Sequence, residues 1–324
     1  MTQATRRPMA LIIAGPTASG KSALALELAA RLGGTVINAD AMQCYRELRV
    51  VTARPTPEDE VRAPHVLYGV LPAAQAGSVA WWREQALSAI TRADLPILCG
   101  GTGMYLRALT QGLSALPEVT PSARDEARAL LAEIGPARLH AALHPEDAAM
   151  LRPSDSQRIA RAFEVWRSSG RSLAAWQREA PMMPPADCRF MAILLDPPRD
   201  ELRAAIARRW TGMMRDGAVK EVAALLDQRL DPGLPAMRAH GVPELAAMLR
   251  GDCDAEEAGR RAIAHTVAYT RRQATWFRNQ ELVVPRLTHR INARIADQTQ
   301  FSERLFADIF AFLHGAVDAP QHDP

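Results

Sequence analysis

The sequence predicts an α/β fold, in which a parallel sheet is flanked by helices and carries an all-helical insertion domain. Two observations predict it. Short apolar runs alternate with helical stretches through residues 9–99, the pattern of a parallel sheet covered on both faces. From about residue 117 to 185 the strand-like runs stop, and segments rich in Ala, Leu and Arg are broken by prolines. We therefore expect a core domain at 1–116 and 186–324 and a helical insertion at 117–185.

The first half of the sheet follows in order along the chain. An apolar strand at Met9–Ala14 leads into a glycine-rich loop, and a helical stretch from Ala23 to Leu32 ends at two glycines. Thr35–Ile37 predicts a second strand, and Leu95–Cys99 predicts a third strand after a helix through Trp81–Arg92. Ligands of such sheets bind beyond the carboxyl ends of the strands, so the residues that follow these three strands should converge on one crevice.

The core resumes after the insertion. The apolar run Phe190–Leu195 predicts a returning strand, and helices are expected at 199–215 and 217–230. The polar, proline-bearing tail after Gly315 is expected to be disordered.

The composition bounds the possible functions. With 324 residues, 48% of them hydrophobic and 23% charged, the chain is typical of a soluble globular protein. Its four cysteines lie far apart without a Cys-x-x-Cys pair, which argues against a disulfide framework or zinc site and favours a reducing cytoplasm. No segment has the length of a membrane span. The net charge of +3 is modest, so nucleic-acid binding would need a local basic face.

Residues 15–22 fit the G-x-x-x-x-G-K-[ST] motif of a P-loop and make the predicted core P-loop NTPase-like. Backbone N–H groups and the positive end of the next helix would bind phosphates, Lys21 would add a point charge, and Ser22 would hold Mg²⁺. Lys21 is one of only two lysines among 39 lysines and arginines. The motif indicates a diphosphate or nucleotide without specifying which. The residues predicted to bind it are Gly15, Pro16, Thr17, Ala18, Ser19, Gly20, Lys21 and Ser22.

Asp40 follows the second strand, and its carboxylate has three possible roles. It could be a base that activates an acceptor, a carboxylate near Mg²⁺, or a polar cap of a helix. The amide of Gln43 lies close to it in sequence, so the two could bind the edge of a nucleobase. Loop packing is the alternative for Gln43 and Tyr45.

Gly100-Gly101-Thr102 follows the third strand. It is either a plain connector or a turn where a ligand approaches the backbone closely while the Thr102 hydroxyl donates to a phosphate. The strand at 95–99 does not end in the acidic residue expected of a Walker B carboxylate. The sequence therefore argues against a motor ATPase.

Basic residues gather in two places. Gln157–Arg161 spaces its arginines for one helix face, and Arg271–Arg278 interleaves arginines with aromatic residues. Each stretch is either an RNA-binding surface or a solvated helix face.

With these motifs in order, the chain resembles the tRNA dimethylallyltransferases over most of its length. The stretches that carry the resemblance are GPTASGKS at 15–22, ADAMQCY at 39–45, TARP at 52–55, APH at 63–65, GGTGMYLRAL at 100–109, GLSALP at 112–117, SDSQRIARAFEVW at 154–166, RRWTGMMRDGAVKEV at 208–222 and RRQATWFR at 271–278.

The resemblance implies transfer of the dimethylallyl group of dimethylallyl diphosphate to the N6 amine of the adenosine 3′-adjacent to the anticodon, with Mg²⁺ and without ATP. It implies that Asp40 is the general base and that Thr102 and Arg209 contact the diphosphate. The insertion would bind the tRNA anticodon stem-loop, and the enzyme would act as a cytoplasmic monomer. The residues implied to contact tRNA are Asp40, Ala41, Met42, Gln43, Thr102, Arg124, Gln157, Arg158, Ile159, Ala160 and Arg161.

Two stretches depart from the family pattern. After Arg238 the chain has Ala239–Glu244 where Gly-Tyr and a basic residue are usual, and Val267-Ala268 stands where Arg-Gln is common. Both lie in the part expected to face tRNA or the donor channel, so contacts to RNA there are expected to differ in detail.

Two other functions share some of these features. A small-molecule or nucleoside kinase would have the same loop, sheet and acid, and Arg158 and Arg161 could then belong to a lid over a γ-phosphate. A non-catalytic RNA-binding protein is less favoured because Asp40 and Thr102 would have no purpose in it.

Overall fold

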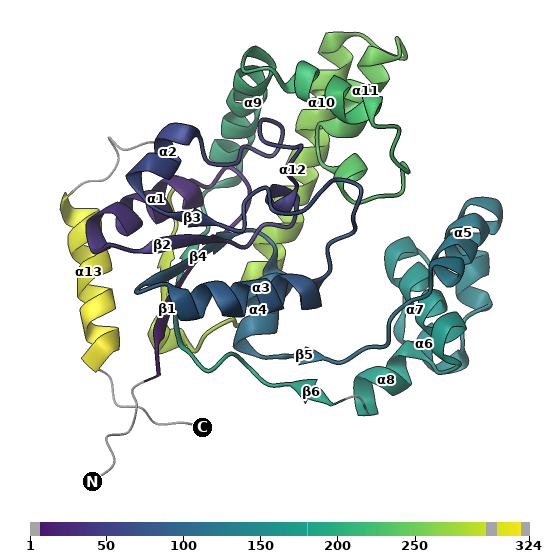
Figure 1. Cartoon of the computed structure of the whole chain (residues 1–324), viewed down its shortest axis with the longest axis horizontal. Coiled ribbons are helices and arrows are strands. Elements are labelled where there is room, and N and C mark those ends of the chain that lie inside the picture. Colours follow the sequence, from purple (N-terminus) through teal and green to yellow (C-terminus); the bar gives the residue numbers. More distant parts are fainter. Residues whose placement is uncertain (1–6, 180, 296–302, 319–324) are drawn as a thin grey trace. The chain divides into compact units, whose positions relative to one another are not determined.

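The computed structural model describes residues 7–179, 181–295 and 303–318, which form two compact units (Figure 1). The larger unit combines Met1–Gln111 with Pro185–Pro324, and the smaller unit is Gly112–Pro184. The smaller unit therefore begins five residues before the expected boundary at 117.

The larger unit is built on a six-stranded sheet with the order β3-β2-β4-β1-β7-β8, in which every neighbouring pair is parallel. The four strands expected from the sequence are present within one residue at each end. The edge strands β3 and β8 were not predicted, because they are short and have no clear apolar run. The strands are β1 (Met9–Ala14), β2 (Thr35–Asn38), β3 (His65–Val66), β4 (Pro96–Gly100), β7 (Arg189–Leu195) and β8 (Thr288–Ile291).

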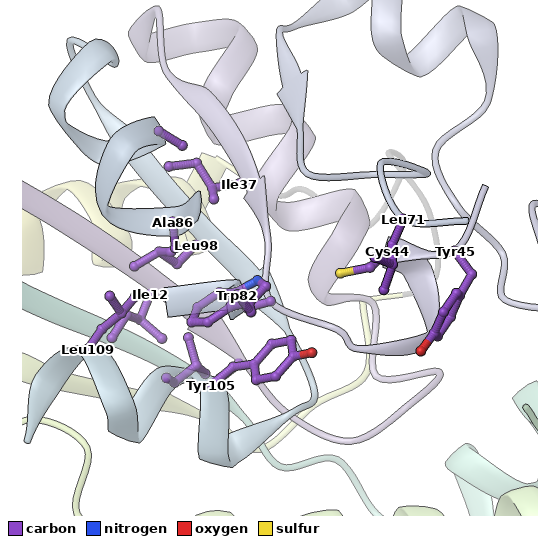
Figure 2. Packing of buried hydrophobic residues seen from close by; sticks show 14 of the residues in the cluster. Ile12, Ile37, Cys44, Tyr45, Leu71, Trp82, Ala86, Leu98, Tyr105 and Leu109 are labelled. Carbon is purple, nitrogen blue, oxygen red and sulfur yellow. The ribbon is translucent and has the colours of Figure 1, made fainter. Parts of the chain in front are cut away.

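The central strand β1 is buried on both faces because successive side chains point to opposite sides of a strand. Leu11 and Ile13 pack with α1 (Lys21–Leu32) and α13 (Glu303–Asp318). Ala10, Ile12 and Ala14 pack instead with α3 (Val79–Arg92) and α4 (Gly103–Thr110). Figure 2 shows Ile12, Leu98 and Trp82 gathered on this second face. Burial of these apolar surfaces, at roughly 25 cal/mol per Å², holds the sheet between its helices.

The remaining helices of the larger unit include the two expected at 199–215 and 217–230, and the longest of them is α12. The expectation that the chain is disordered after Gly315 is wrong for residues 316–318, because α13 continues through them; residues 319–324 lie outside the described residues. The remaining helices are α2 (Pro57–Arg62), α9 (Arg199–Arg215), α10 (Ala218–Asp227), α11 (Val242–Leu249) and α12 (Ala255–Asn279).

The smaller unit contains four helices around a separate apolar core, to which Leu139, Ile159 and Phe163 contribute. Its first helix is interrupted at Gly135, whose φ of 75° and ψ of 169° are not helical. The prediction that this insertion is all-helical is wrong in one respect, because two strands of two residues each pair in antiparallel fashion, too short to give a readable alternation. The elements are β5 (Leu113–Ser114), α5 (Pro121–Ala141), α6 (Pro145–Met150), α7 (Ser156–Ser169), α8 (Leu173–Glu179) and β6 (Met182–Met183).

Among the described helices, none is both long and apolar enough to cross a membrane.

Candidate active site

Three loops follow the carboxyl ends of adjacent strands. The glycine loop (Gly15–Ser22) follows β1, the Gly100–Gly103 turn follows β4, and the Asp40 loop (Ala39–Tyr45) follows β2. In the sheet, β4 lies between β2 and β1. The turn is therefore the middle one of the three, as expected for a crevice at the carboxyl edge of a parallel sheet.

The glycine loop is held in a strained shape by the segment that follows β8. Ala18 has a φ of +66°, which is uncommon for a residue with a side chain. At Gly20, with a φ of +96°, an added Cβ would lie 1.8 Å from the carbonyl oxygen of Ile295. Arg294 Nε donates to the Ala18 carbonyl at 3.0 Å, and the Ile295 amide donates to the Ser19 carbonyl at 3.0 Å. The loop thus opens directly into α1, whose first N–H groups are available to an anion.

Lys21 and Ser22 begin α1 and differ in exposure. Lys21 is buried, and its Nζ lies 3.5 Å from the Pro16 carbonyl oxygen. Burial lowers the pKa of the Lys21 ammonium, Asp40 and Cys99 oppose that shift, and Arg209 adds to it. Ser22 is exposed at the mouth of the loop. The arrangement places a buried cation and an exposed serine next to each other at the start of α1.

The Asp40 loop is shaped by Asn38, the last residue of β2, which is 0% exposed. Its Oδ1 accepts the Asp40 N–H at 2.8 Å, and its Nδ2 donates to the carbonyls of Asp40 and Leu67, each at 3.0 Å. Trp82 Nε1 donates to the Asn38 carbonyl at 2.8 Å. The Asp40 carboxylate itself accepts the Met42 N–H at 3.1 Å. One carboxylate oxygen is thus used for orientation, which leaves the other for a reacting proton.

The Gly100–Gly103 turn is joined to the Asp40 loop by hydrogen bonds in both directions. The Ala39 amide donates to the Cys99 carbonyl at 2.8 Å, and the Thr102 amide donates to the Ala39 carbonyl at 3.1 Å. The Thr102 hydroxyl accepts the Ala41 N–H at 3.0 Å. Because that hydroxyl accepts from the protein, its own proton can be donated to a ligand.

Arg209 reaches the same crevice from α9. It donates to the Thr52 carbonyl at 2.9 Å, and Gln43 Nε2 donates to that carbonyl as well, at 2.9 Å. Burial lowers the pKa of the Arg209 guanidinium, and the charge of Asp40 opposes the shift. Asp40 therefore acts on both Arg209 and Lys21. Two cations that are far apart in the sequence thus share the influence of one carboxylate.

A cavity of about 470 Å³ opens beside Ser22. Burial holds the pKa of the Tyr68 phenol, which lines this cavity, well above its ordinary value, and Cys99 and Asp40 act in the same direction. The lining combines apolar groups with the guanidinium groups of Arg54 and Arg62 and the carboxylate of Asp59. The lining residues are Ser22, Ala23, Leu26, Val36, Ala53, Arg54, Pro55, Asp59, Arg62, His65 and Tyr68.

Gln273 and Tyr269 lie on α12. The sequence alone indicated no role for either residue in the site. Gln273 is buried and bonds to both the glycine loop and the Gly100–Gly103 turn. Tyr269 lies one turn earlier; burial and then Asp40 raise its pKa to about 12. The arginines of the RRQATWFR stretch indicate either an RNA-binding surface or a solvated helix face, and neither alternative gives Gln273 a role. The spacing of Tyr269, Gln273 and Trp276 on one helical face was the signal that could have identified these residues.

The remaining predicted residues lie in the smaller unit. Arg124 is exposed on α5, and α7 exposes Gln157, Arg158 and part of Arg161. The Ile159 side chain is 0% exposed in the core of this unit, so it anchors the helix that carries those groups. Ala160 is half-buried.

Comparisons with known proteins give the family of the chain. The family model described as "IPP transferase" matches residues 43–280, and a model described as "Isopentenyl transferase" matches residues 8–70. The tRNA dimethylallyltransferase of Granulibacter bethesdensis is 58% identical over 311 residues, covering 94% of this chain and 97% of that protein. That of Acidiphilium cryptum is 56% identical over 324 residues, covering 97% and 99%.

Solved structures show the same fold. The full-length tRNA isopentenylpyrophosphate transferase of Bacillus halodurans matches with a TM-score of 0.67 and 29% identity, over 96% of this chain and 97% of that one. A eukaryotic dimethylallyltransferase acting on tRNA matches with a TM-score of 0.76 and 20% identity, over 98% and 81%; this second likeness concerns the fold alone.

Proposed function

Because this chain belongs to the IPP transferase family, we propose that it transfers the dimethylallyl group of dimethylallyl diphosphate to the N6 amine of the adenosine 3′-adjacent to the anticodon of tRNA. The C–O bond between the allylic carbon and the diphosphate breaks, and a C–N bond to N6 forms. Diphosphate leaves, and the N6 proton passes to the enzyme. No ATP enters this balance.

The observation that carries the proposal is that the Asp40 loop is bonded to the Gly100–Gly103 turn, next to the glycine loop, and that the Asp40 charge acts on the pKa values of both Lys21 and Arg209. The adenine amine is a weak nucleophile because its lone pair is delocalised into the ring, so a carboxylate that takes its proton assists attack. The allylic carbon becomes cation-like as the diphosphate leaves, and the growing charge on the leaving group needs fixed positive groups. One crevice thus has a base for the acceptor and cations for the leaving group.

The remaining polar groups would orient the two substrates. The N–H groups at the start of α1 and the Thr102 hydroxyl would bind diphosphate oxygens, and Gln43 would lie beside the adenine edge. An adenine in a loop must leave its stack before N6 can enter such a crevice, as for other enzymes that modify bases. Catalysis would then come mainly from positioning and from charge stabilisation.

The residues present fit a magnesium ion shared with the diphosphate. Ser22 is an exposed residue at the start of α1, and its hydroxyl would be the protein ligand of the ion. No group of three or more His, Cys, Asp or Glu side chains able to hold a metal occurs among the described residues. Magnesium usually takes few protein ligands and completes its shell with phosphate oxygens and water. When bound, the ion would neutralise charge on the leaving diphosphate.

Exposed arginines on the smaller unit support a polyanionic partner. Arg124 and Arg158 would contact phosphates of the anticodon stem-loop, together with Arg161 and Gln157. We propose that the enzyme acts as a monomer in the cytoplasm, where its tRNA substrate is found.

A labelling experiment tests the function. The protein is incubated with dimethylallyl diphosphate labelled in the allyl group, unmodified tRNA and Mg²⁺, and label is sought in the RNA. We expect transfer without ATP, and loss of transfer when the target adenosine is replaced by guanosine. A nucleoside or small-molecule kinase would instead transfer label from γ-labelled ATP to a small acceptor, and a non-catalytic RNA-binding protein would transfer neither label.

A further inference from the structure

The Gln273 side chain on α12 makes a hydrogen bond with each of two loops of the candidate active site. Its Oε1 accepts the Thr17 N–H of the glycine loop at 2.8 Å, and its Nε2 donates to the Gly101 carbonyl of the Gly100–Gly103 turn at 2.9 Å. The side chain is 5% exposed. We propose that Gln273 is a positioning residue that fixes the distance between the loop for the diphosphate and the loops for the acceptor. This inference rests on the proposed transferase function.

The connections among the three loops explain why one side chain has this effect. The Asp40 loop is bonded directly to the Gly100–Gly103 turn through Ala39, Ala41 and Thr102, so these two loops form one acceptor side. The β1–β4 pairing, which ends at Ala14 and Gly100, fixes the bases of the glycine loop and of this acceptor side. The Gln273 amide adds a link further along the two loops, between Thr17 and Gly101, and so restricts how far the donor side that carries Lys21 can move from the acceptor side that carries Asp40.

Close packing leaves the amide little freedom to move. A Cβ added to Gly101 would lie 2.2 Å from Gln273 Nε2, and one added to Gly103 would lie 2.3 Å from the Trp276 ring. On the opposite side of the turn, a Cβ at Gly100 would lie 2.1 Å from the Ala39 backbone. The turn is thus enclosed between α12 and the Asp40 loop.

The chemistry of the two partners makes glutamine specifically suited to this position. Thr17 presents an N–H and needs an acceptor, whereas Gly101 presents a carbonyl and needs a donor. A carboxylate satisfies Thr17 but places an oxygen against the Gly101 carbonyl. An apolar side chain leaves both backbone groups buried without partners. Because the Thr17 N–H is used by Gln273, the part of the loop that binds diphosphate begins at Ala18.

The reaction depends on the distance between the allylic carbon and N6, which the separation of the donor and acceptor sides determines. Reacting atoms must approach to about 3–3.5 Å, and a displacement of about 1 Å lowers the rate roughly 10²-fold. A gap between the donor and acceptor sides would slow the chemical step with both substrates bound. It would change tRNA affinity little, since the arginines that would bind RNA phosphates lie elsewhere.

The test compares Gln273→Met with Thr270→Val in the full chain. Thr270 is a matched control, because it is 3% exposed on the same helix and its hydroxyl bonds only within that helix, to Val267. Single-turnover rate constants are measured with enzyme in excess and both substrates saturating, since such constants do not depend on the folded fraction. We expect a decrease of roughly 10²-fold for Gln273→Met. We expect less than about a twofold change for Thr270→Val, which removes one bond within the helix and none to either loop.

Gln273→Glu provides a second readout that loss of folding does not imitate. A protonated glutamic acid has an acceptor and a donor like glutamine, whereas the ionised form lacks the donor. Burial beside a carbonyl raises the pKa of such a carboxyl group. The rate of Gln273→Glu divided by that of wild type should therefore rise several-fold as the pH falls from about 8 to about 6. Division by the wild-type rate removes the common titration of the catalytic base.

The outcomes separate this inference from the proposed function. If wild type transfers no label, the function itself fails. If wild type is active and Gln273→Met keeps its single-turnover rate, the inference is overturned, even where thermal stability falls. If Gln273→Met does not fold, the pH ratio of Gln273→Glu decides, and a ratio that is flat or falls toward low pH overturns the inference.

Discussion

The two units of this protein present their polar side chains in opposite ways. In the larger unit the candidate catalytic groups are held by buried partners, of which Asn38 is 0% exposed and bonds to both the N–H and the carbonyl of Asp40. In the smaller unit Arg158 has 76% of its side chain exposed and pairs with Asp155 on its own helix. Fixed groups of the first kind act on a reaction rate, because their geometry exists before the substrate arrives. Exposed groups of the second kind act on binding, through salt-dependent attraction.

Buried and exposed polar contacts also contribute different free energies to stability. Loss of a partner from a buried polar group costs about 1–3 kcal/mol. An exposed ion pair such as Arg161–Glu164 contributes about 0–1 kcal/mol. Substitutions in the larger unit should therefore change both stability and turnover, whereas those on the face of α7 should change neither. Four predictions follow this division, from the largest expected effect to the smallest.

The largest expected effect is a decrease in the reaction rate when the carboxylate of Asp40 is removed. Asp40→Asn keeps an oxygen that can accept the Met42 N–H but cannot take a proton. We expect transfer to slow by roughly 10²–10⁴-fold, the usual contribution of general-base catalysis. The measurement is the single-turnover rate, with tRNA affinity determined in parallel by filter binding and expected to stay unchanged. A wild-type rate in this variant would exclude Asp40 as the base.

Loss of the group that orients the base should produce the next largest effect. Asn38→Ala leaves the Asp40 N–H and the carbonyls of Asp40 and Leu67 without their buried partner. We expect the free energy of unfolding to fall by roughly 3 kcal/mol and turnover to fall as the Asp40 loop loosens. Urea unfolding measures the first effect. Asn279→Ala, at the exposed end of α12, is the control and should change stability by less than about 0.5 kcal/mol. Equal stability of the two variants would contradict the role given to Asn38.

The sequence located these three loops better than the side chains that support them. The glycine loop, Asp40 and Thr102 could be found because each follows a recognisable apolar strand, and parallel strands bring their carboxyl ends together. Asn38 and Gln273 could not be assigned a role in the same way. Their partners are backbone groups of distant segments, and one residue type in a sequence does not reveal which N–H or carbonyl it will meet. The short strands β3, β5, β6 and β8 were missed because they carry too few residues for a period to appear.

The pH dependence of donor binding tests whether the buried Lys21 ammonium binds the diphosphate. Burial lowers the pKa of its ammonium, so the charge that attracts diphosphate is present below that lowered pKa and is lost as the pH rises through it. We expect the KM for dimethylallyl diphosphate to rise toward alkaline pH, by about tenfold for each unit beyond the pKa. Lys21→Arg should remove this rise because a guanidinium stays charged. Lys220 is exposed on α10, so the control variant Lys220→Ala should keep the wild-type dependence of KM on pH. If Lys21→Arg also shows the wild-type dependence, a group other than Lys21 titrates.

The smallest expected effect concerns tRNA binding by the exposed arginines of α7. The double change Arg158→Ala and Arg161→Ala removes two exposed guanidinium groups and leaves Ile159 in its core. If each arginine meets one phosphate, the slope of log affinity for tRNA against log salt should decrease by roughly 1.4. The free energy of unfolding should change by less than about 1 kcal/mol, and the single-turnover rate at saturating tRNA should not change.

Arg92→Ala is the control for this last prediction, because Arg92 is exposed and bonds only to Ser88 of its own helix in the larger unit. Its salt slope should equal that of wild type. A lower single-turnover rate of the α7 variant at saturating tRNA would contradict the view that the exposed arginines act on binding alone. It would mean that they also position the adenosine. An unchanged salt slope would instead place the tRNA phosphates on other arginines, with Arg124 on α5 the next candidate.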